Sequence, residues 1–182
     1  MKSTDYYADA VLWAVKENIT KGTTNTTFSP AGTLTRGQVV AMLYRMAGSP
    51  AVTANTTGFS DVDNGAYYAD AVKWASGKEI VGGYADGTFA PNRAITREQL
   101  AAILYRYAKA NGADISVGED TNLLSYKDFQ SVGQYAVPAL QWAVGSGLIG
   151  GTTNAMLSPK GTATRAQAAV ILVRYVGMTA AK

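Results

Sequence analysis

The chain has 182 residues, of which 47% are hydrophobic and 16% charged, so it can form an apolar core and lacks the composition of a disordered protein. It contains no cysteine and no histidine, which excludes disulfides, cysteine-ligated metal sites and a histidine base. The net charge of +3 favours anionic partners weakly, and no segment is apolar over the roughly 18 residues that a membrane span needs. We therefore expect no metal, no cofactor, no nucleic-acid partner and no membrane segment.

The chain opens with a predicted helix at residues 5–18, in which Trp13 and other apolar residues share one face at spacings of three and four. A polar loop follows at residues 19–30. A second helix is expected to begin at Thr35, because Thr35 and Gln38 form a T-x-x-Q capping box ahead of an apolar stripe.

The same order of helix, glycine-containing loop and capped helix occurs twice more. The second copy has predicted helices at residues 67–76 and 96–110, separated by a loop at 82–89. In the third copy Pro138 lies in the first turn of the first helix, where proline is tolerated, and Thr164 caps the second helix. Such internal repetition determines how the rest of the chain is interpreted.

The three copies align without gaps from a tryptophan to a Thr-Arg pair 23 residues later. The repeated tryptophans are Trp13, Trp74 and Trp142, and the repeated arginines, called here the Thr-Arg arginines, are Arg36, Arg97 and Arg165. A second set, the mid-helix arginines, comprises Arg45, Arg106 and Arg174. One copy of about 45 residues would bury too little surface to be stable alone, so we expect the three to share one core.

This register predicts an all-α fold of three helix-loop-helix repeats. Their expected boundaries are residues 1–50, 59–111 and 126–178, with linkers at 51–58 and 112–125, the second of which should run over the surface. The first repeat lacks the Phe-x-Asp that opens the second, and no apolar signal segment is present at the start. We therefore expect a fragment of a longer protein, with any signal peptide upstream.

The order of these motifs resembles the S-layer homology domain of bacterial surface proteins: a tryptophan helix, a Gly-Gly loop, F-x-P and then I-T-R-E-Q at a helix start. The resemblance covers nearly the whole chain as three copies. It implies a pseudo-threefold helical assembly with a shared central bundle. It also implies grooves between repeats that hold secondary cell-wall polysaccharide, often carrying pyruvate ketals, and a location in the cell wall or S-layer of a Gram-positive bacterium. Glutamine replaces the glutamate of the family's Thr-Arg-Ala-Glu motif in all three copies, so a ligand contact that needs this carboxylate is in doubt.

The Thr-Arg arginines are the leading candidates for glycan contact. A guanidinium matches a carboxylate bidentately, and the free N–H groups of a helix start favour an anion. The alternative is a structural arginine paired with the aspartates that open the later repeats, Asp61 and Asp128. These two aspartates are themselves candidates at a groove.

The glycine-containing loops are the next candidates, because glycine permits close approach of the backbone to a sugar, although a helix end is the alternative role. They contribute Gly82, Gly83, Tyr84, Gly150, Gly151 and Thr152, together with Gly22 and Thr23 of the first loop, where Lys21 departs from the Gly-Gly pattern. The repeated tryptophans are predicted to be core residues, with sugar stacking as a second-tier role. The mid-helix arginines should lie on the surface or in salt bridges between repeats.

Two functions remain open and a third is disfavoured. The first is a non-catalytic module that anchors its protein to pyruvylated cell-wall polysaccharide. The second is a self-associating or protein-binding module of a surface lattice without glycan specificity. Glycoside hydrolysis needs two carboxylates that face one bond, and only Asp61 and Asp128 recur near a predicted groove, so we do not expect an enzyme.

Overall fold

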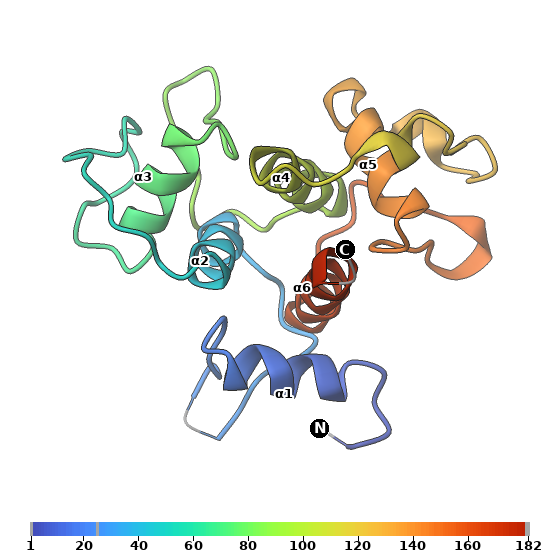
Figure 1. Cartoon of the computed structure of the whole chain (residues 1–182), viewed down its shortest axis with the longest axis horizontal. Coiled ribbons are helices and arrows are strands. Elements are labelled where there is room, and N and C mark those ends of the chain that lie inside the picture. The colour runs from blue at the N-terminus through green and yellow to red at the C-terminus, as the bar shows by residue number, and fades with distance from the viewer. Residues whose placement is uncertain (1, 25, 181–182) are drawn as a thin grey trace. The chain divides into compact units, whose positions relative to one another are not determined.

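The computed structural model describes residues 2–24 and 26–180, and in this part of the chain the fold is all-α, as predicted (Figure 1). The helices are α1 (Ala8–Lys16), α2 (Arg36–Met46), α3 (Ala69–Gly77), α4 (Arg97–Ala110), α5 (Val137–Gly145) and α6 (Arg165–Ala180). Short 3-10 helices lie at Ser116–Gly118, Phe129–Ser131, Gln134–Ala136 and Thr153–Ala155. None of the helices described is long and apolar enough to cross a membrane.

The chain forms two compact units that cut across the three sequence repeats. Unit 1 comprises Met1–Ala94 and Thr164–Val173, and unit 2 comprises Ile95–Ala163 and Arg174–Lys182. Unit 1 therefore contains α1, α2, α3 and the beginning of α6, whereas unit 2 contains α4, α5 and the end of α6. The repeat boundaries and the pseudo-threefold arrangement stay predictions.

The three capping boxes are confirmed. In α2 the backbone N–H of Gln38 donates to Thr35 Oγ1 (3.3 Å), and the N–H of Thr35 donates to Gln38 Oε1 (3.0 Å). The starts of α4 and α6 have the same reciprocal bonds. Glutamine thus fulfils the capping role with its amide oxygen, and the helix starts do not need a carboxylate at this position.

In unit 1, α2 and α3 lie side by side (Figure 1). The rings of Tyr44 and Trp74 pack with their centroids 5.5 Å apart. Two loop residues are also fully buried. They are Leu34, just before α2, and Phe89, in the loop before α4. The helical spacing of apolar residues therefore yields a core to which the loops also contribute.

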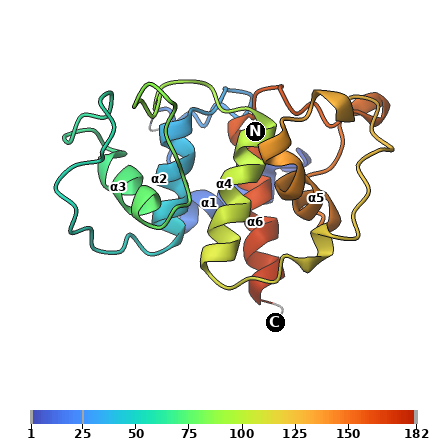
Figure 2. The same ribbon diagram turned by 90° about the horizontal axis from the view of Figure 1, so that it is seen from above.

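In unit 2, α4 and α5 lie side by side (Figure 2), and Trp142 is fully buried with its ring 5.7 Å from that of Tyr105. The 112–125 linker is mostly exposed, as expected for a segment that runs over the surface, but it also packs against α5. Leu123 is buried, and Gly118 approaches so closely that a Cβ there would lie 3.0 Å from the backbone nitrogen of Trp142. This linker therefore completes the core around α5.

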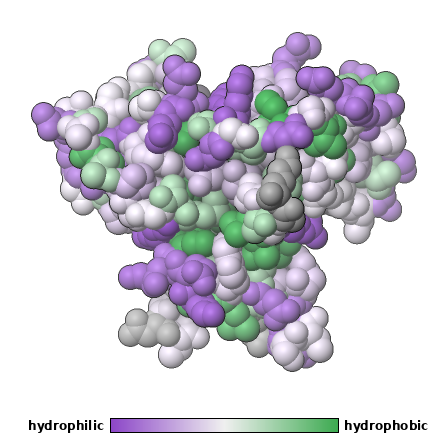
Figure 3. Space-filling view, viewed as in Figure 1, coloured by the Kyte–Doolittle hydropathy of each residue, from purple (hydrophilic) through white to green (hydrophobic). Residues whose placement is uncertain are grey.

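The burial of the tryptophans decides which of them has a ring available to a ligand. Trp74 and Trp142 are 8% and 0% exposed, so they are core residues and offer no open face for a sugar. Trp13 is half-buried, so stacking of its ring on a sugar stays a prediction. On the face seen in Figure 3, hydrophilic side chains (purple) are interspersed with apolar ones (green).

Replacing Glu79 with glycine is expected to raise the free energy of unfolding by about 0.5–1 kcal/mol. Glu79 follows the end of α3 in the left-handed region (φ +56°), where the third repeat has Gly147 (φ +68°). Urea unfolding of the two proteins measures the difference. The matched control is Lys78→Gly at the preceding residue (φ −99°), which should lower stability; a stabilising effect of both changes would contradict the argument.

Candidate functional site

The Thr-Arg arginines are 7–8% exposed, and each connects two sequence repeats within one unit. In unit 1, Arg36 donates from Nε to Phe89 O (2.8 Å) and from Nη2 to Gly82 O (3.1 Å). Arg165 makes the corresponding bonds to Phe28 O (2.8 Å) and Lys21 O (2.6 Å).

In unit 2, Arg97 repeats this geometry with Leu157 O and Gly150 O, both at 2.8 Å. Aromatic rings add to the packing in unit 1, where Arg36 Cζ lies 4.6 Å from the centroid of Phe89 and 5.0 Å from that of Tyr84. The guanidinium groups therefore hold the loops in place through carbonyl oxygens.

The starts of the Thr-Arg helices are not open anion sites, contrary to the expectation of free N–H groups. The N–H groups of Arg36 and Gly37 donate to carbonyls of the loop before α4, at 3.0 and 2.9 Å. The corresponding N–H groups at the starts of α4 and α6 also donate to carbonyls, at 2.9–3.0 Å. The positive end of each helix is thus compensated by neighbouring backbone.

The aspartates that open the later repeats cap a turn. Asp61 accepts the N–H groups of Phe89 and Ala90, both at 2.7 Å, and Asp128 accepts those of Leu157 and Ser158 at 2.8 and 2.7 Å. In each pair the second residue has a positive φ (+54° and +52°), so the carboxylate stabilises a strained turn. Among the residues described, no group of acidic side chains is arranged to hold a metal ion.

The glycine-containing loops are closed by contacts within the protein and are not helix ends. A Cβ on Gly83 would lie 2.6 Å from Thr88 O, one on Gly151 would lie 2.8 Å from the Tyr126 ring, and one on Gly22 would overlap two carbonyl oxygens. The hydroxyl groups of Thr23 and Thr152 donate across their loops to the carbonyls of residues 27 and 156, both at 3.1 Å. Glycine is required at Gly22, Gly83 and Gly151 for close approach of the protein to itself, whereas a Cβ on Gly82 or Gly150 would meet no atom within 4 Å.

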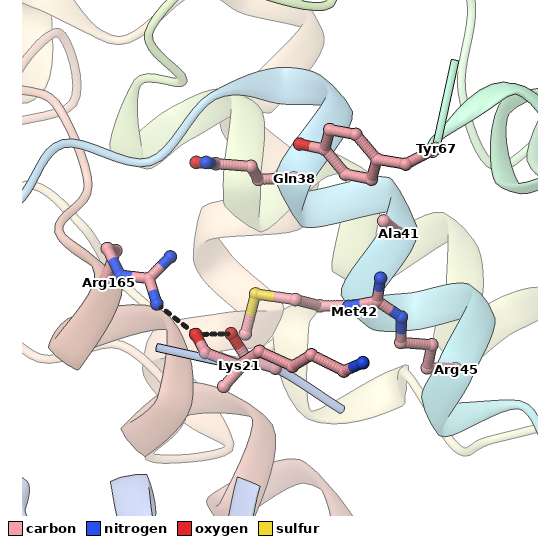
Figure 4. A pocket seen from close by; sticks show the side chains of 8 residues that line it. Lys21, Gln38, Ala41, Met42, Arg45, Tyr67 and Arg165 are labelled. Carbon is pink, nitrogen blue, oxygen red and sulfur yellow. Dashed lines mark hydrogen bonds between the residues drawn. The ribbon is translucent and has the colours of Figure 1, made fainter. Parts of the chain in front are cut away.

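Unit 1 contains a pocket of about 160 Å³ beside α2, called here the basic pocket. It is lined by Thr20, Lys21, Gln38, Ala41, Met42, Arg45, Tyr67 and Arg165. Figure 4 shows Lys21, Arg45 and Arg165 around one opening, with Gln38 and Tyr67 along its opposite side. These side chains come from the loop after α1, from α2, from the segment before α3 and from the start of α6.

Three cations and no acidic residue are among the eight residues that line the basic pocket. Arg165 is fixed by its bonds to the first loop, and Arg45 Nη1 lies 3.3 Å from Ile19 O. Tyr67 is largely exposed, and partial desolvation raises the pKa of its hydroxyl, while the positive charges of Arg45 and Arg165 oppose this rise. Burial lowers the pKa of Arg165, but a guanidinium remains protonated at neutral pH. The pocket therefore combines fixed positive charge with a neutral phenol and an amide.

The basic pocket brings together only part of the predicted site. Arg165 lines it, and Gly22 and Thr23 directly follow its Lys21. Of the two roles predicted for the mid-helix arginines, the surface position is confirmed for Arg106 and Arg174, which are exposed, whereas Arg45 is half-buried. Arg45 and Arg174 donate to carbonyls near the ends of α1 and α5.

Arg45 and Tyr67 were missed as pocket residues, although both carried a signal. Arginine recurs at the position of Arg45 in every repeat, and tyrosine recurs at the position of Tyr67 as Tyr6 and Tyr135. Gln38 was interpreted only as a helix cap, and its second role depends on tertiary neighbours.

Comparison with known proteins identifies the family. Residues 1–40, 58–101 and 125–169 match the family model of the S-layer homology domain. The chain is 33% identical over 172 residues to an endoglucanase of Bacillus sp. (strain KSM-635), a match that covers 94% of this chain and 18% of that enzyme. It is 27% identical to a cellulosome-anchoring protein of Acetivibrio thermocellus (85% of this chain, 34% of that protein) and 28% identical to a surface-layer 125 kDa protein of Lysinibacillus sphaericus (96% and 14%).

The chain thus spans about a third or less of the length of these relatives, and the endoglucanase matches over a small share of its own length. S-layer homology domains are non-catalytic modules that anchor proteins at the cell surface and cell wall. With three tandem matches over most of its length, this chain belongs to the S-layer homology family.

Proposed function

We propose that this chain anchors its protein to the cell wall by binding an anionic secondary cell-wall polysaccharide, one that carries pyruvate ketals, in the basic pocket of unit 1. The observation that carries the proposal is the convergence of Lys21, Arg45 and Arg165 on one small opening without an acidic neighbour among its lining residues. A ketal carboxylate would pair with these cations, and Tyr67 and Gln38 offer hydrogen bonds to sugar hydroxyls.

The size of the basic pocket supports recognition of one acidic residue of a polymer. Its volume of about 160 Å³ lies below the range of about 300–1,000 Å³ that encloses whole drug-sized ligands. A single contact of this size would give modest affinity. Repetition of the acidic group along the polysaccharide, and of the module over the cell surface, would raise the overall strength of attachment.

The Thr-Arg arginines and the glycine-containing loops contribute to this function mainly as a frame. Arg165 places the carbonyl of Lys21, and with it the Lys21 side chain, at the wall of the pocket. The positions that match Lys21 in the other repeats are Gly82 and Gly150, which bring no charge. We therefore expect the first loop to contact the glycan through the Lys21 side chain, a charged contact that the other two loops cannot make.

The test is co-sedimentation of the chain with purified sacculi of a Gram-positive bacterium, before and after acid removal of the secondary polysaccharide. We expect binding to untreated sacculi, its loss after acid treatment, and its decrease as salt rises, because partly exposed charges are screened. Binding that survives acid treatment would contradict the proposal and indicate peptidoglycan or a wall protein. Self-association of the chain without any binding to sacculi would favour the lattice function instead.

A further inference from the structure

Unit 2 contains a buried carboxylate that the proposed function does not use. Glu98 is the second residue of α4 and is 3% exposed. Its Oε2 accepts the N–H of Gly133 at 2.9 Å, and its Oε1 accepts the Tyr135 hydroxyl at 3.1 Å and Lys160 Nζ at 2.6 Å. An ammonium, a phenol and a backbone amide, from two different loops, thus converge on one carboxylate.

The other two Thr-Arg helix starts have no matching acidic residue. The positions that correspond to Glu98 are Gly37 and Ala166, and those that correspond to Lys160 are Ala31 and Asn92. The anion, from the second repeat, and its cation, from the third, therefore meet at the start of α4, and both are absent from the corresponding positions at the starts of α2 and α6.

A comparison of the two units shows what the carboxylate does. In unit 1, the N–H of Gly65, which corresponds to Gly133, donates to the nearby side chain of Asp63 at 2.8 Å. The third repeat has Ser131 at the position of Asp63, and Glu98 reaches the glycine N–H from α4 instead. Tyr135 corresponds to Tyr67, so Glu98 also holds the counterpart of a residue that lines the basic pocket.

The donors around Glu98 form a complete anion site. An ammonium, a hydroxyl and an amide donate to this carboxylate and satisfy most of its acceptor capacity. These hydrogen bonds offset the free-energy cost of burying its charge. The side chain of Glu98 is 4% exposed, whereas that of Lys160 is 57% exposed, so the site would be accessible to small anions from the solvent if the carboxylate were absent.

We propose that Glu98 is a built-in anion that fills the site formed by Gly133, Tyr135 and Lys160, and thereby closes this site to acidic groups of the glycan. Glu98 is thus a specificity-determining residue that restricts acidic ligands to other parts of the module, above all to the basic pocket. The part of this proposal that concerns the glycan rests on the proposed function, and the part that concerns the filled anion site does not.

The test compares the whole chain with its Glu98→Ala variant, with acetate as the probe and chloride at equal ionic strength as the control. The variant should unfold about 5 °C lower than the parent, and about 100 mM acetate should restore much of this loss by mass action. The backbone N–H signal of Gly133 should shift with acetate in the variant and not in the parent. A Gly133 shift of equal size in both proteins would overturn the proposal, as would a folded variant that does not respond to acetate.

Two further variants keep the test decisive. Glu98→Ala combined with Lys160→Ala should lose the response to acetate, because the ammonium is the principal donor. Glu98→Gln keeps the side-chain volume, so it should remain folded and unresponsive even if the alanine variant does not fold. A response of Glu98→Gln equal to that of Glu98→Ala would show that acetate binds elsewhere.

Co-sedimentation with sacculi separates this proposal from the proposed function. Restoration by acetate in a chain that never binds sacculi would leave the filled anion site standing and refute the glycan function. If the parent binds sacculi and Glu98→Ala responds to acetate, the variant should bind acidic polysaccharide more strongly than the parent. Unchanged binding would overturn the closing role of Glu98.

Discussion

Reversal of the charge at Lys21 is expected to weaken binding to acidic cell-wall polysaccharide about tenfold, because the change replaces attraction with repulsion and costs about 1.5 kcal/mol. The side chain of Lys21 lines the basic pocket, whereas Arg165 is bonded to its backbone carbonyl. The matching position is glycine in the other two repeats, so the fold does not depend on this side chain. Lys21→Glu should therefore change affinity and leave thermal stability nearly unaltered.

The matched control is Lys16→Glu, which changes the net charge equally on an exposed residue of α1 that does not line the pocket. Calorimetric titration with purified polysaccharide at fixed ionic strength measures both variants. The Lys21 variant should also show a smaller dependence of affinity on salt, since one attractive charge is lost. Equal effects of the two variants would mean that only net charge matters, and the basic pocket would lose its role.

Replacement of Arg97 with methionine is expected to lower the free energy of unfolding by about 3 kcal/mol. Arg97 is 8% exposed and donates to two carbonyl oxygens, those of Leu157 and Gly150, both at 2.8 Å. Methionine retains most of the apolar stem but leaves both carbonyls without the guanidinium, and a buried acceptor without a partner is costly.

The control for this change is Arg106→Met on the same helix, where the side chain is exposed. Its substitution should alter stability by less than about 0.5 kcal/mol. Thermal and urea unfolding of both variants give the comparison. A loss at Arg106 as large as that at Arg97 would refute the structural role assigned to the Thr-Arg arginines.

The capped helices were predictable because their signals are local. Thr96 and Gln99 are three residues apart and form the capping box by themselves, and the apolar stripe that follows gives α4 a face to bury. Pro138 in the first turn of α5 is equally local. The capping box and the apolar stripe occur in all three repeats, and this repetition strengthened the prediction of each helix.

The candidate site was less predictable, because residue type indicated chemistry but not partners. The Thr-Arg arginines were expected at open helix starts and instead bind carbonyl oxygens, since the helix N–H groups are already paired with neighbouring loops. Asp61 was expected near an arginine or a sugar, and it caps the turn at Phe89 and Ala90, 28 and 29 residues away. In both cases the partner is a backbone group. Almost every residue carries the same backbone groups, so residue type does not indicate which position provides the partner.

The amino-acid sequence by itself determined the all-α class, the threefold repetition and the family, because helix caps, apolar spacing and repeated motifs are properties of neighbouring residues. Only the tertiary structure decided which side chains meet. Arg165 and Lys21 are 144 residues apart and share a hydrogen bond, and together with Arg45 they line the basic pocket. Glu98 acquires its three donors in the same way, from loops 35–62 residues away. Such contacts depend on how loops pack against helix starts, and no local propensity specifies that packing.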